Sequence, residues 1–207
     1  MPGTGKGTAD GEIRAVLFNK DGTLFDFREV WLPAYRAAAA EVACAVGDPA
    51  LVPALLAAGG YDEASQSFAP LSCFVSGSTA DISATWKALL GPLTPPAMCA
   101  SLIRTLDAWS AREVAPVVDL EAFFGGLVGR GLRLGIATMD SHAALGATLA
   151  RTTWGRHLDF ACGGDAGHGT KPEAGMVRAF CASVGLTSAE IAVVGDSLAD
   201  LRMARAA

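Results

Sequence analysis

The chain has 207 residues, a formal net charge of −5 and 51% hydrophobic residues. This length suffices for one substantial core, or for one core with a small inserted domain. The slightly acidic charge argues against a nucleic-acid partner, which would need clustered basic residues. No apolar run reaches the roughly 18 residues of a membrane span. With no visible secretion signal, we expect a cytoplasmic protein without a membrane partner.

The cysteines support the same expectation. Their number is odd and no two have the Cys-x-x-Cys spacing of a metal site or a redox pair. Reduced thiols in a cytoplasmic protein explain them best. They are Cys44, Cys73, Cys99, Cys162 and Cys181.

The first residues carry a glycine-rich segment. Residues 2–8, Pro-Gly-Thr-Gly-Lys-Gly-Thr, resemble the phosphate loop of nucleotide kinases. That loop works because a buried strand holds it and a following helix aims backbone amides at the phosphates. Here only Met1 precedes it, and residues 9–11 are not typical of a helix start. We therefore predict a flexible tail rather than a nucleotide site.

An apolar run ends in a polar turn at residues 15–26. Residues 15–18 are typical of a short buried strand, and Gly22 allows a sharp turn behind it. Asn19 and Asp21 are two positions apart, so their side chains would flank one reacting group. In an open α/β sheet, such strand ends form the ligand site. The alternative is an ordinary Asx-turn, in which Asn and Asp-Gly are common.

Residues 27–114 indicate a run of helices separated by Gly and Pro. The sequence predicts a helix that leads in at residues 31–36 and ends at 46, and further helices at 51–58, 79–89 and 96–114. Ser78 or Thr79 would cap the third. We expect Trp86 and Trp109 in the core of this segment. Arg36 and the loop 76–78 are candidates for contacting a ligand.

A second strand is predicted at residues 132–137, after an amphipathic helix at 120–128. It ends in Thr138 and Met139, which bring a hydroxyl to the end of the strand. Taken alone, a threonine at this place is explained equally well by its β-propensity. A third strand over residues 160–162 runs into Gly163-Gly164-Asp165.

Lys171 comes just before a predicted helix, with Pro172 near its start and Gly185 near its end, as is usual at helix termini. Taken alone, such a lysine is usually a solvated surface residue. The apolar face of this helix consists of Met176, Val177, Phe180 and Val184.

The fourth strand, residues 191–194, is followed by Gly195 and Asp196, and then by Asp200 four positions later. Carboxylates are hard oxygen ligands of the kind that Mg²⁺ prefers. The pair therefore indicates a magnesium site. Alternatively, Asp196 could cap the helix that starts near Leu198.

Together these strand ends resemble, in order and spacing, the four motifs of the haloacid dehalogenase superfamily, and its phosphoglycolate-phosphatase-like members in particular. The resemblance implies an α/β fold, with a Rossmann-like parallel sheet as the core and an inserted all-helical C1 cap. The core would comprise residues 1–26 and 115–207, and the cap residues 27–114. The strand order would be 191–194, 15–18, 132–137, 160–162. The family has a further strand and helix, so we expect another segment or another cover at the edge strand 191–194.

The resemblance also implies roles for the strand-end residues. In the family, position 19 is the nucleophile and Asp21 the general acid/base, where dehalogenases carry Tyr. The activity would be hydrolysis of a small phosphorylated metabolite through an aspartyl-phosphate intermediate. The catalytic set would be Asn19, Asp21, Thr138 and Lys171. The phosphate contacts would come from Gly22, Thr138, Met139 and Lys171. The ligands of a Mg²⁺ cofactor would be Asn19, Asp21, Asp196 and Asp200.

Asn19 departs from the family pattern, because an amide is a poor nucleophile and brings no charge to a metal ion. Losing a covalent nucleophile lowers turnover by a factor on the order of 10⁴ to 10⁶. We therefore expect a phosphatase that is inactive or very slow, which suits a deliberately inactivated, substrate-trapping variant. The alternative is a natural, non-catalytic member that binds a phosphorylated ligand or partner. No residue selects one substrate.

Overall fold

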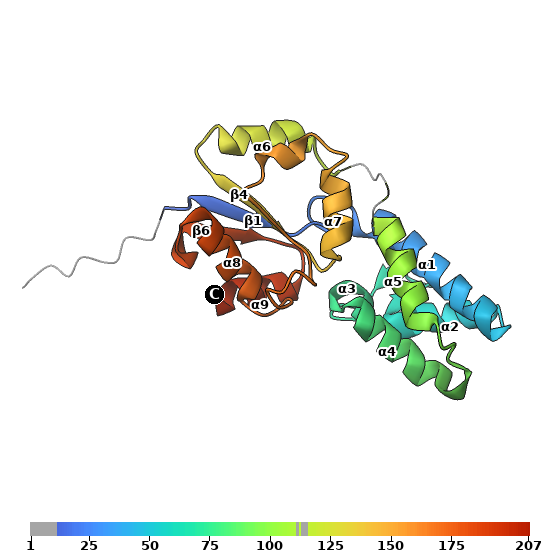
Figure 1. Cartoon of the computed structure of the whole chain (residues 1–207). Coiled ribbons are helices and arrows are strands. Elements are labelled where there is room, and N and C mark those ends of the chain that lie inside the picture. The colour runs from blue at the N-terminus through green and yellow to red at the C-terminus, as the bar shows by residue number, and fades with distance from the viewer. Residues whose placement is uncertain (1–11, 111, 113–115) are drawn as a thin grey trace, which may run out of the picture.

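The computed structural model describes residues 12–110, 112 and 116–207 (Figure 1). The glycine-rich segment 2–8 and the predicted boundary between 114 and 115 lie outside these residues. None of the described helices combines the length and apolar character that a membrane crossing requires.

The described residues form the following strands (β), α-helices (α) and 3-10 helices (η) in chain order. The elements are β1 (Ala15–Phe18), α1 (Phe27–Val46), α2 (Leu51–Gly59), β2 (Tyr61–Asp62), β3 (Ser67–Phe68), α3 (Cys73–Ser76), α4 (Thr79–Leu90), η1 (Gly91–Leu93), α5 (Met98–Ser110), α6 (Leu120–Val128), β4 (Arg133–Ala137), α7 (His142–Leu149), η2 (Trp154–His157), β5 (Phe160–Cys162), α8 (Gly175–Val184), η3 (Ser188–Glu190), β6 (Ile191–Val194) and α9 (Leu198–Ala206).

Four parallel strands form the main sheet in the order β5-β4-β1-β6, which confirms the predicted α/β fold and strand order. At the end of β1, Phe18 lies opposite Ile136 of β4 and Val194 of β6. On the other side of β4, Ala137 lies opposite Cys162 of β5. Because the strands are parallel and in register, their carboxyl ends meet at one edge of the sheet.

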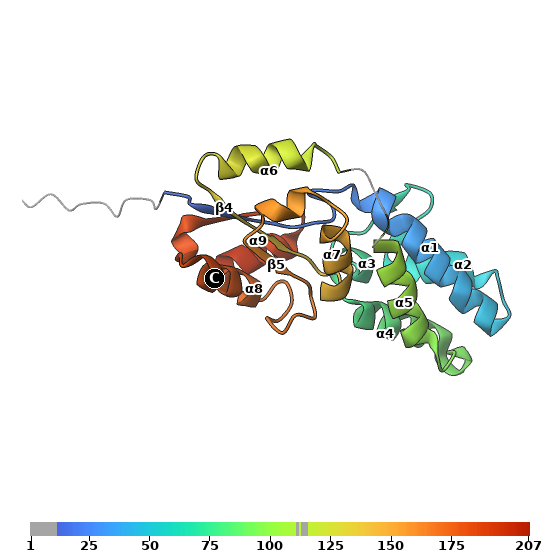
Figure 2. The same cartoon turned by 45° about the horizontal axis from the view of Figure 1, so that its top comes forward.

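Helices cover both faces of this sheet, with α6 on one face and α8 and α9 on the other (Figures 1 and 2). The side chains of β1 alternate to match. Val16 and Phe18 belong to the apolar cluster that includes Phe124 of α6. Leu17 belongs to the cluster that includes Phe180 of α8. A strand buried on both faces explains the continuous apolar run at 15–18.

β6 lies at one edge of the sheet, as predicted. No described segment pairs with its outer side, and Val194 at its end is 40% exposed. The edge strand is short, which limits its pairing with other chains.

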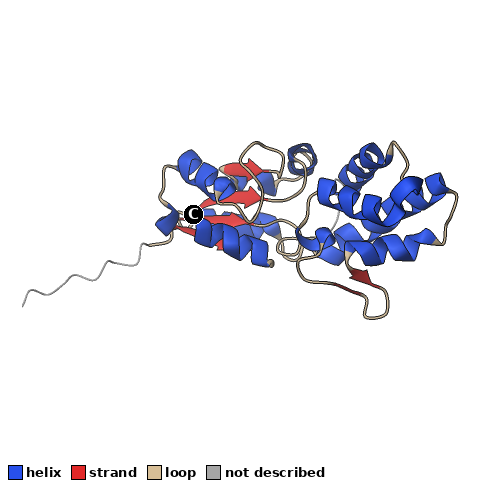
Figure 3. Cartoon of the chain, turned by 90° about the horizontal axis from the view of Figure 1, so that it is seen from below, coloured by secondary structure: helices blue, strands red, loops and turns tan. Residues whose placement is uncertain are grey.

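The residues between β1 and α6 form a group of helices at one end of the molecule (Figure 3). We call residues 27–110 the helical segment. Trp86 is fully buried in its core, as predicted. Tyr35 stacks on Phe74 with ring centroids 3.8 Å apart, and its hydroxyl donates to the Phe74 carbonyl at 2.7 Å. The segment is not entirely helical, because β2 and β3 pair as a short antiparallel hairpin.

Three helix boundaries differ from the sequence prediction. α1 begins at Phe27, because the Asp26 side chain accepts two backbone N–H groups of the first turn. Pro33 lies inside this helix, where it removes one backbone hydrogen bond and hides the true start from a sequence reading. α5 ends at Ser110 rather than at 114. α8 begins at Gly175, so Pro172 lies before the helix.

Candidate active site

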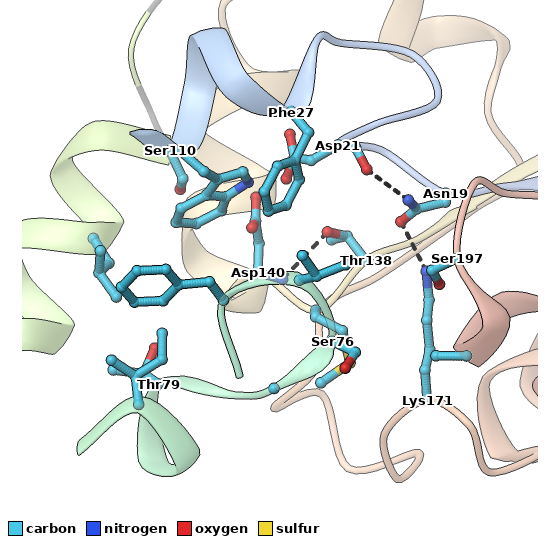
Figure 4. A pocket seen from close by; sticks show the side chains of 18 of the residues that line it. Asn19, Asp21, Phe27, Ser76, Thr79, Ser110, Thr138, Asp140, Lys171 and Ser197 are labelled. Carbon is cyan, nitrogen blue, oxygen red and sulfur yellow. Dashed lines mark hydrogen bonds between the residues drawn. The ribbon is translucent and has the colours of Figure 1, made fainter. Parts of the chain in front are cut away.

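A pocket lies between the carboxyl edge of the sheet and the helical segment (Figure 4). Its empty volume, including its opening to solvent, is about 780 Å³. The sheet side of the pocket brings together most of the predicted site residues: Asn19, Asp21, Thr138, Met139, Lys171 and Asp196.

Asn19 joins several strand ends through its side chain. Its backbone N–H donates to the Val194 carbonyl at 2.8 Å, which fixes it at the end of β1. The Nδ2 group donates to the Asp21 carbonyl at 2.7 Å and to Asp196 Oδ1 at 2.9 Å. The Oδ1 atom accepts from Lys171 Nζ at 2.8 Å. The amide is therefore fully hydrogen-bonded at the centre of the site (Figure 4).

Gly22 permits the close approach of Asp196. Its φ of +86° is a conformation that other residues rarely adopt. A Cβ atom at this position would lie 2.2 Å from Asp196 Oδ2. Thr23 Oγ1 donates to the other oxygen, Oδ1, at 2.8 Å. The turn after β1 therefore holds the carboxylate that follows β6.

Thr138 lies directly after β4 and is buried. Its backbone N–H donates to the Cys162 carbonyl at 3.0 Å. Its Oγ1 accepts the backbone N–H of Asp140 at 3.2 Å. Met139, between them, also lines the pocket. The hydroxyl that the sequence analysis identifies therefore lies at the sheet edge beside Asn19 and Asp21.

Lys171 is not a solvated surface residue, since it is only 6% exposed. Besides Asn19, its Nζ contacts Asp200 Oδ1 at 2.6 Å. The other oxygen of Asp200 accepts the backbone N–H and the hydroxyl of Ser197, at 3.1 and 2.6 Å. Asp200 is thus buried beside the lysine at the start of α9, and it does not line the pocket. Ser197, and not Asp196, caps this helix.

Sequence reasoning misses a buried ionic cluster next to these residues. Lys20 Nζ donates to both oxygens of Asp21, at 2.7 and 3.0 Å, and to Asp140 Oδ2 at 2.7 Å. Burial acts to lower the pKa of Lys20, but the two carboxylates outweigh it and raise that pKa. Burial, together with the Asp21 carboxylate, raises the pKa of Asp140 against the opposing effect of Lys20.

Two signals in the sequence could have indicated this cluster. Lys20 stands between two polar site positions, where a charged side chain would have to find a partner. Asp140 follows Thr138 by two positions at the end of a predicted strand, where an alternating pattern places both side chains on the same side. Their pairing depends on two segments 120 positions apart along the chain.

The helical segment forms the opposite wall of the pocket. Ser76 and Gly77 from the predicted ligand loop line it, whereas Arg36 does not and instead pairs with Glu63 at 2.6 Å. The full set from this segment is Phe27, Trp31, Tyr35, Phe74, Val75, Ser76, Gly77, Thr79, Ile82, Leu106, Asp107 and Ser110.

Three oxygen donors could hold a hard cation at the sheet edge: the Asp21 carbonyl, the Asp196 carboxylate and the Asn19 amide. Their chemical type fits Mg²⁺. However, Asn19 turns its N–H group toward the other two. Only the Asp196 carboxylate carries a full negative charge, because the Asn19 amide and the Asp21 carbonyl are neutral. In the described ranges, no three His, Cys, Asp or Glu side chains are placed to share a metal. The site with Asn19 therefore fits a divalent cation poorly.

A comparison of the sequence with known protein families finds a match. The family model of the haloacid dehalogenase-like hydrolases matches residues 13–207. No relative was found among curated protein sequences.

Solved structures share the fold at low sequence identity. A predicted phosphoglycolate phosphatase from Haemophilus somnus has a TM-score of 0.69 at 15% identity, and the match covers 93% of this chain and 81% of that chain. CbbY from Rhodobacter sphaeroides in complex with phosphate has a TM-score of 0.60 at 21% identity, with coverages of 94% and 82%. An Asp-to-Asn variant of CbbY in complex with xylulose-1,5-bisphosphate has a TM-score of 0.61, with the same identity and coverages. Since the family match spans nearly the whole described chain, the protein belongs to the haloacid dehalogenase-like hydrolases.

Proposed function

We propose that this chain carries the site of a Mg²⁺-dependent phosphomonoester hydrolase, made inactive or very slow by Asn19 at the nucleophile position. The observation that carries the proposal is the meeting of Asn19, Asp21, Thr138, Lys171 and Asp196 in one pocket at the sheet edge. Asn19 and Asp21 follow β1, whereas Thr138 follows β4, Lys171 precedes α8 and Asp196 follows β6, so the site joins four segments that lie far apart in the sequence. Its substrate would be a small phosphorylated metabolite, covered by residues 27–114 as a cap over the core of 1–26 and 115–207.

With aspartate at position 19, the carboxylate oxygen would form a bond to phosphorus as the bond from phosphorus to the alcohol oxygen breaks. Asp21 would give its proton to the departing alcohol. In the second half of the reaction, water would attack phosphorus while Asp21 takes a proton from it. The aspartyl-phosphate bond then breaks, and both aspartates return to their starting state.

The other residues would hold the phosphoryl group and balance its charge. Thr138 Oγ1 and the backbone N–H of Met139 would donate hydrogen bonds to its oxygens. Gly22, which the sequence also predicts as a phosphate contact, does not line the pocket, and its N–H already donates to the Phe25 carbonyl at 2.8 Å. Lys171 would supply a positive charge, and we propose that Asp200 positions this lysine rather than binding metal, since both its oxygens are already engaged. Lys20 would hold the Asp21 side chain in place through hydrogen bonds to both its oxygens, in the protonated state that opens the reaction and in the ionised state that follows.

A Mg²⁺ ion, when bound, neutralises charge on the phosphoryl oxygens. The residues that would hold it are position 19, the Asp21 carbonyl and Asp196. With Asn19 the affinity for the ion should be weak, because the amide carries no charge and presents its N–H group. Aspartate at this position would complete the set of donors.

The second candidate is a natural, non-catalytic member of the family that binds a phosphorylated ligand or partner. One observation favours it: every hydrogen-bonding group of the Asn19 side chain that faces the site has a partner, so asparagine is well accommodated. The codon for residue 19 in the source gene separates the candidates. An Asp codon would mean that the asparagine was introduced, and an Asn codon that it is natural.

The test of the proposed activity is the variant Asn19→Asp, assayed with Mg²⁺ on an aryl phosphate and a panel of small phosphomonoesters. We expect turnover to rise by a factor on the order of 10⁴ to 10⁶. Asn19→Ala is the matched control, because it also removes the amide but provides no nucleophile. A folded Asn19→Asp variant that binds Mg²⁺ and hydrolyses none of these esters would exclude the phosphatase assignment.

A further inference from the structure

The wall of the pocket formed by the helical segment is mainly apolar, and its polar side chains besides Tyr35 are Ser76, Thr79, Asp107 and Ser110. Phe27 and Trp31 of α1 and Val75 of α3 line it and remain partly exposed, although Phe27 and Trp31 also pack against the buried core of the segment. Leu106 and Ile82 line it from α5 and α4. Partly exposed aromatic side chains in a pocket offer contact area to the non-reacting part of a ligand.

The same wall carries no basic side chain in the part of the chain that the structure describes. Its one charged group is the carboxylate of Asp107, which accepts a hydrogen bond from the Ser141 hydroxyl at 3.0 Å. Arg36 pairs with Glu63 away from the pocket, and Arg104 lies 3.7 Å from Glu41. None of the basic residues of the segment lines the pocket, namely Arg28, Arg36, Lys87 and Arg104.

On the sheet side, Lys171 is the only cation among the described residues that line the pocket. It already contacts Asn19 and Asp200, and the proposed function assigns it to the transferred phosphoryl group. Lys20 is buried beneath the pocket and paired with two carboxylates. A second anionic group on the substrate would find no free cation here and would lie near Asp107 and Asp140. Burying an unpaired charge in this way is strongly unfavourable.

From this wall we infer the substrate class, an inference that rests on the proposed function. The substrate is a phosphate monoester of an uncharged alcohol with an apolar or aromatic body. Esters that carry a second anion, such as a carboxylate or another phosphate, are excluded. The substrate would thus differ from the xylulose-1,5-bisphosphate bound to the CbbY variant, which carries two phosphates.

The kinetic test compares two substrates that differ by one carboxylate group, with the uncharged 4-carbamoylbenzyl phosphate as the control for the size of that group. In Asn19→Asp with Mg²⁺, we expect kcat/KM for benzyl phosphate to exceed that for 4-carboxybenzyl phosphate by about 10- to 100-fold. An equal or lower value for benzyl phosphate would overturn the inference about the substrate class and leave the phosphatase assignment intact.

A binding test on the unchanged chain separates the two proposals. Benzylphosphonate and 4-carboxybenzylphosphonate cannot be hydrolysed, so their dissociation constants are measured by calorimetry with Asn19 in place. Tighter binding of benzylphosphonate, by about tenfold or more, supports the substrate class even if Asn19→Asp proves inactive. Equal binding, or tighter binding of the carboxylated compound, overturns it.

A variant that introduces a positive charge sharpens the same test. Ser76→Lys places a cation in the apolar wall, and Ser76→Met is a control of similar length without charge. We expect Ser76→Lys to raise the relative affinity for 4-carboxybenzylphosphonate by about tenfold compared with Ser76→Met. If both variants bind the two phosphonates in the same ratio, charge at this wall does not select the ligand and the inference is wrong.

Discussion

The two walls of the pocket hold their side chains in different ways. On the sheet side, the polar groups Asn19, Lys171 and Asp196 lie in one continuous set of hydrogen bonds that joins segments following three different strands. On the helical side, Phe74 and Tyr35 are held by apolar packing around Trp86. The comparison shows that the groups able to do chemistry and the groups able to select a ligand belong to separately stabilised parts of the fold.

The largest expected effect is a loss of turnover after a substitution on the sheet side of the pocket. In the background of Asn19→Asp, the further change Asp21→Asn should lower turnover by about 10² to 10⁴, because the acid/base is lost while its shape is kept. The measurement is the initial rate with an aryl phosphate. Circular dichroism and Mg²⁺ titration of the double variant are the controls for folding and for the metal site. A double variant that keeps the full rate would remove Asp21 from the proposed mechanism.

A substitution in the core of the helical segment should lower the free energy of unfolding. Trp86 is fully buried, so Trp86→Ala should lower the free energy of unfolding by about 3–5 kcal/mol. Leu93 is 62% exposed in the same segment, and Leu93→Ala should change the free energy of unfolding by less than about 0.5 kcal/mol. Urea unfolding followed by circular dichroism measures both. Two separate transitions in Trp86→Ala would mean that the helical segment unfolds independently of the sheet.

A polar contact joins the two walls, and its loss should have an intermediate effect. The Ser141 hydroxyl donates to Asp107 and also accepts the N–H of Ala144 at the start of α7. Ser141→Ala removes both bonds and should destabilise the protein by about 1–2 kcal/mol. Asp107→Ala removes only the first and should have about half that effect. Equal effects in thermal unfolding would show that the helix cap contributes little.

The smallest effect lies outside the pocket, at the start of β6. Backbone and side-chain hydrogen bonds from Thr187, then Arg14, lower the pKa of Glu190 to about 2. A lowered pKa means that this carboxylate stabilises the fold above its ordinary value near 4.5, and that the contribution is lost as the pH falls toward 2. The free energies of unfolding of Glu190→Gln and of the unchanged chain should therefore differ at pH 6, and the difference should shrink below pH 4.5 and vanish only as the pH falls through about 2. If the difference in free energy of unfolding between the two proteins stays constant with pH, the charge of the Glu190 carboxylate does not stabilise the fold.

Much of the sheet could be predicted from the sequence, because local patterns determine it. The apolar runs at 15–18, 132–137 and 191–194 are strands, and the polar residues behind them meet at one edge. The start of α1 was predicted too late because Pro33 is read as a helix breaker, whereas Asp26 caps the helix upstream of it.

The sequence by itself determined which residues stand at the strand ends, including Asn19, because strand length and turn residues are local properties. Only the tertiary structure decided how those residues are partnered. The ion pairs of Lys20 with Asp140 and of Lys171 with Asp200 depend on strand order and register. Arg36 pairs with Glu63 and does not line the pocket. The physical reason is that a charged side chain takes the partner that the fold brings within about 3 Å, and spacing along the chain does not fix that distance.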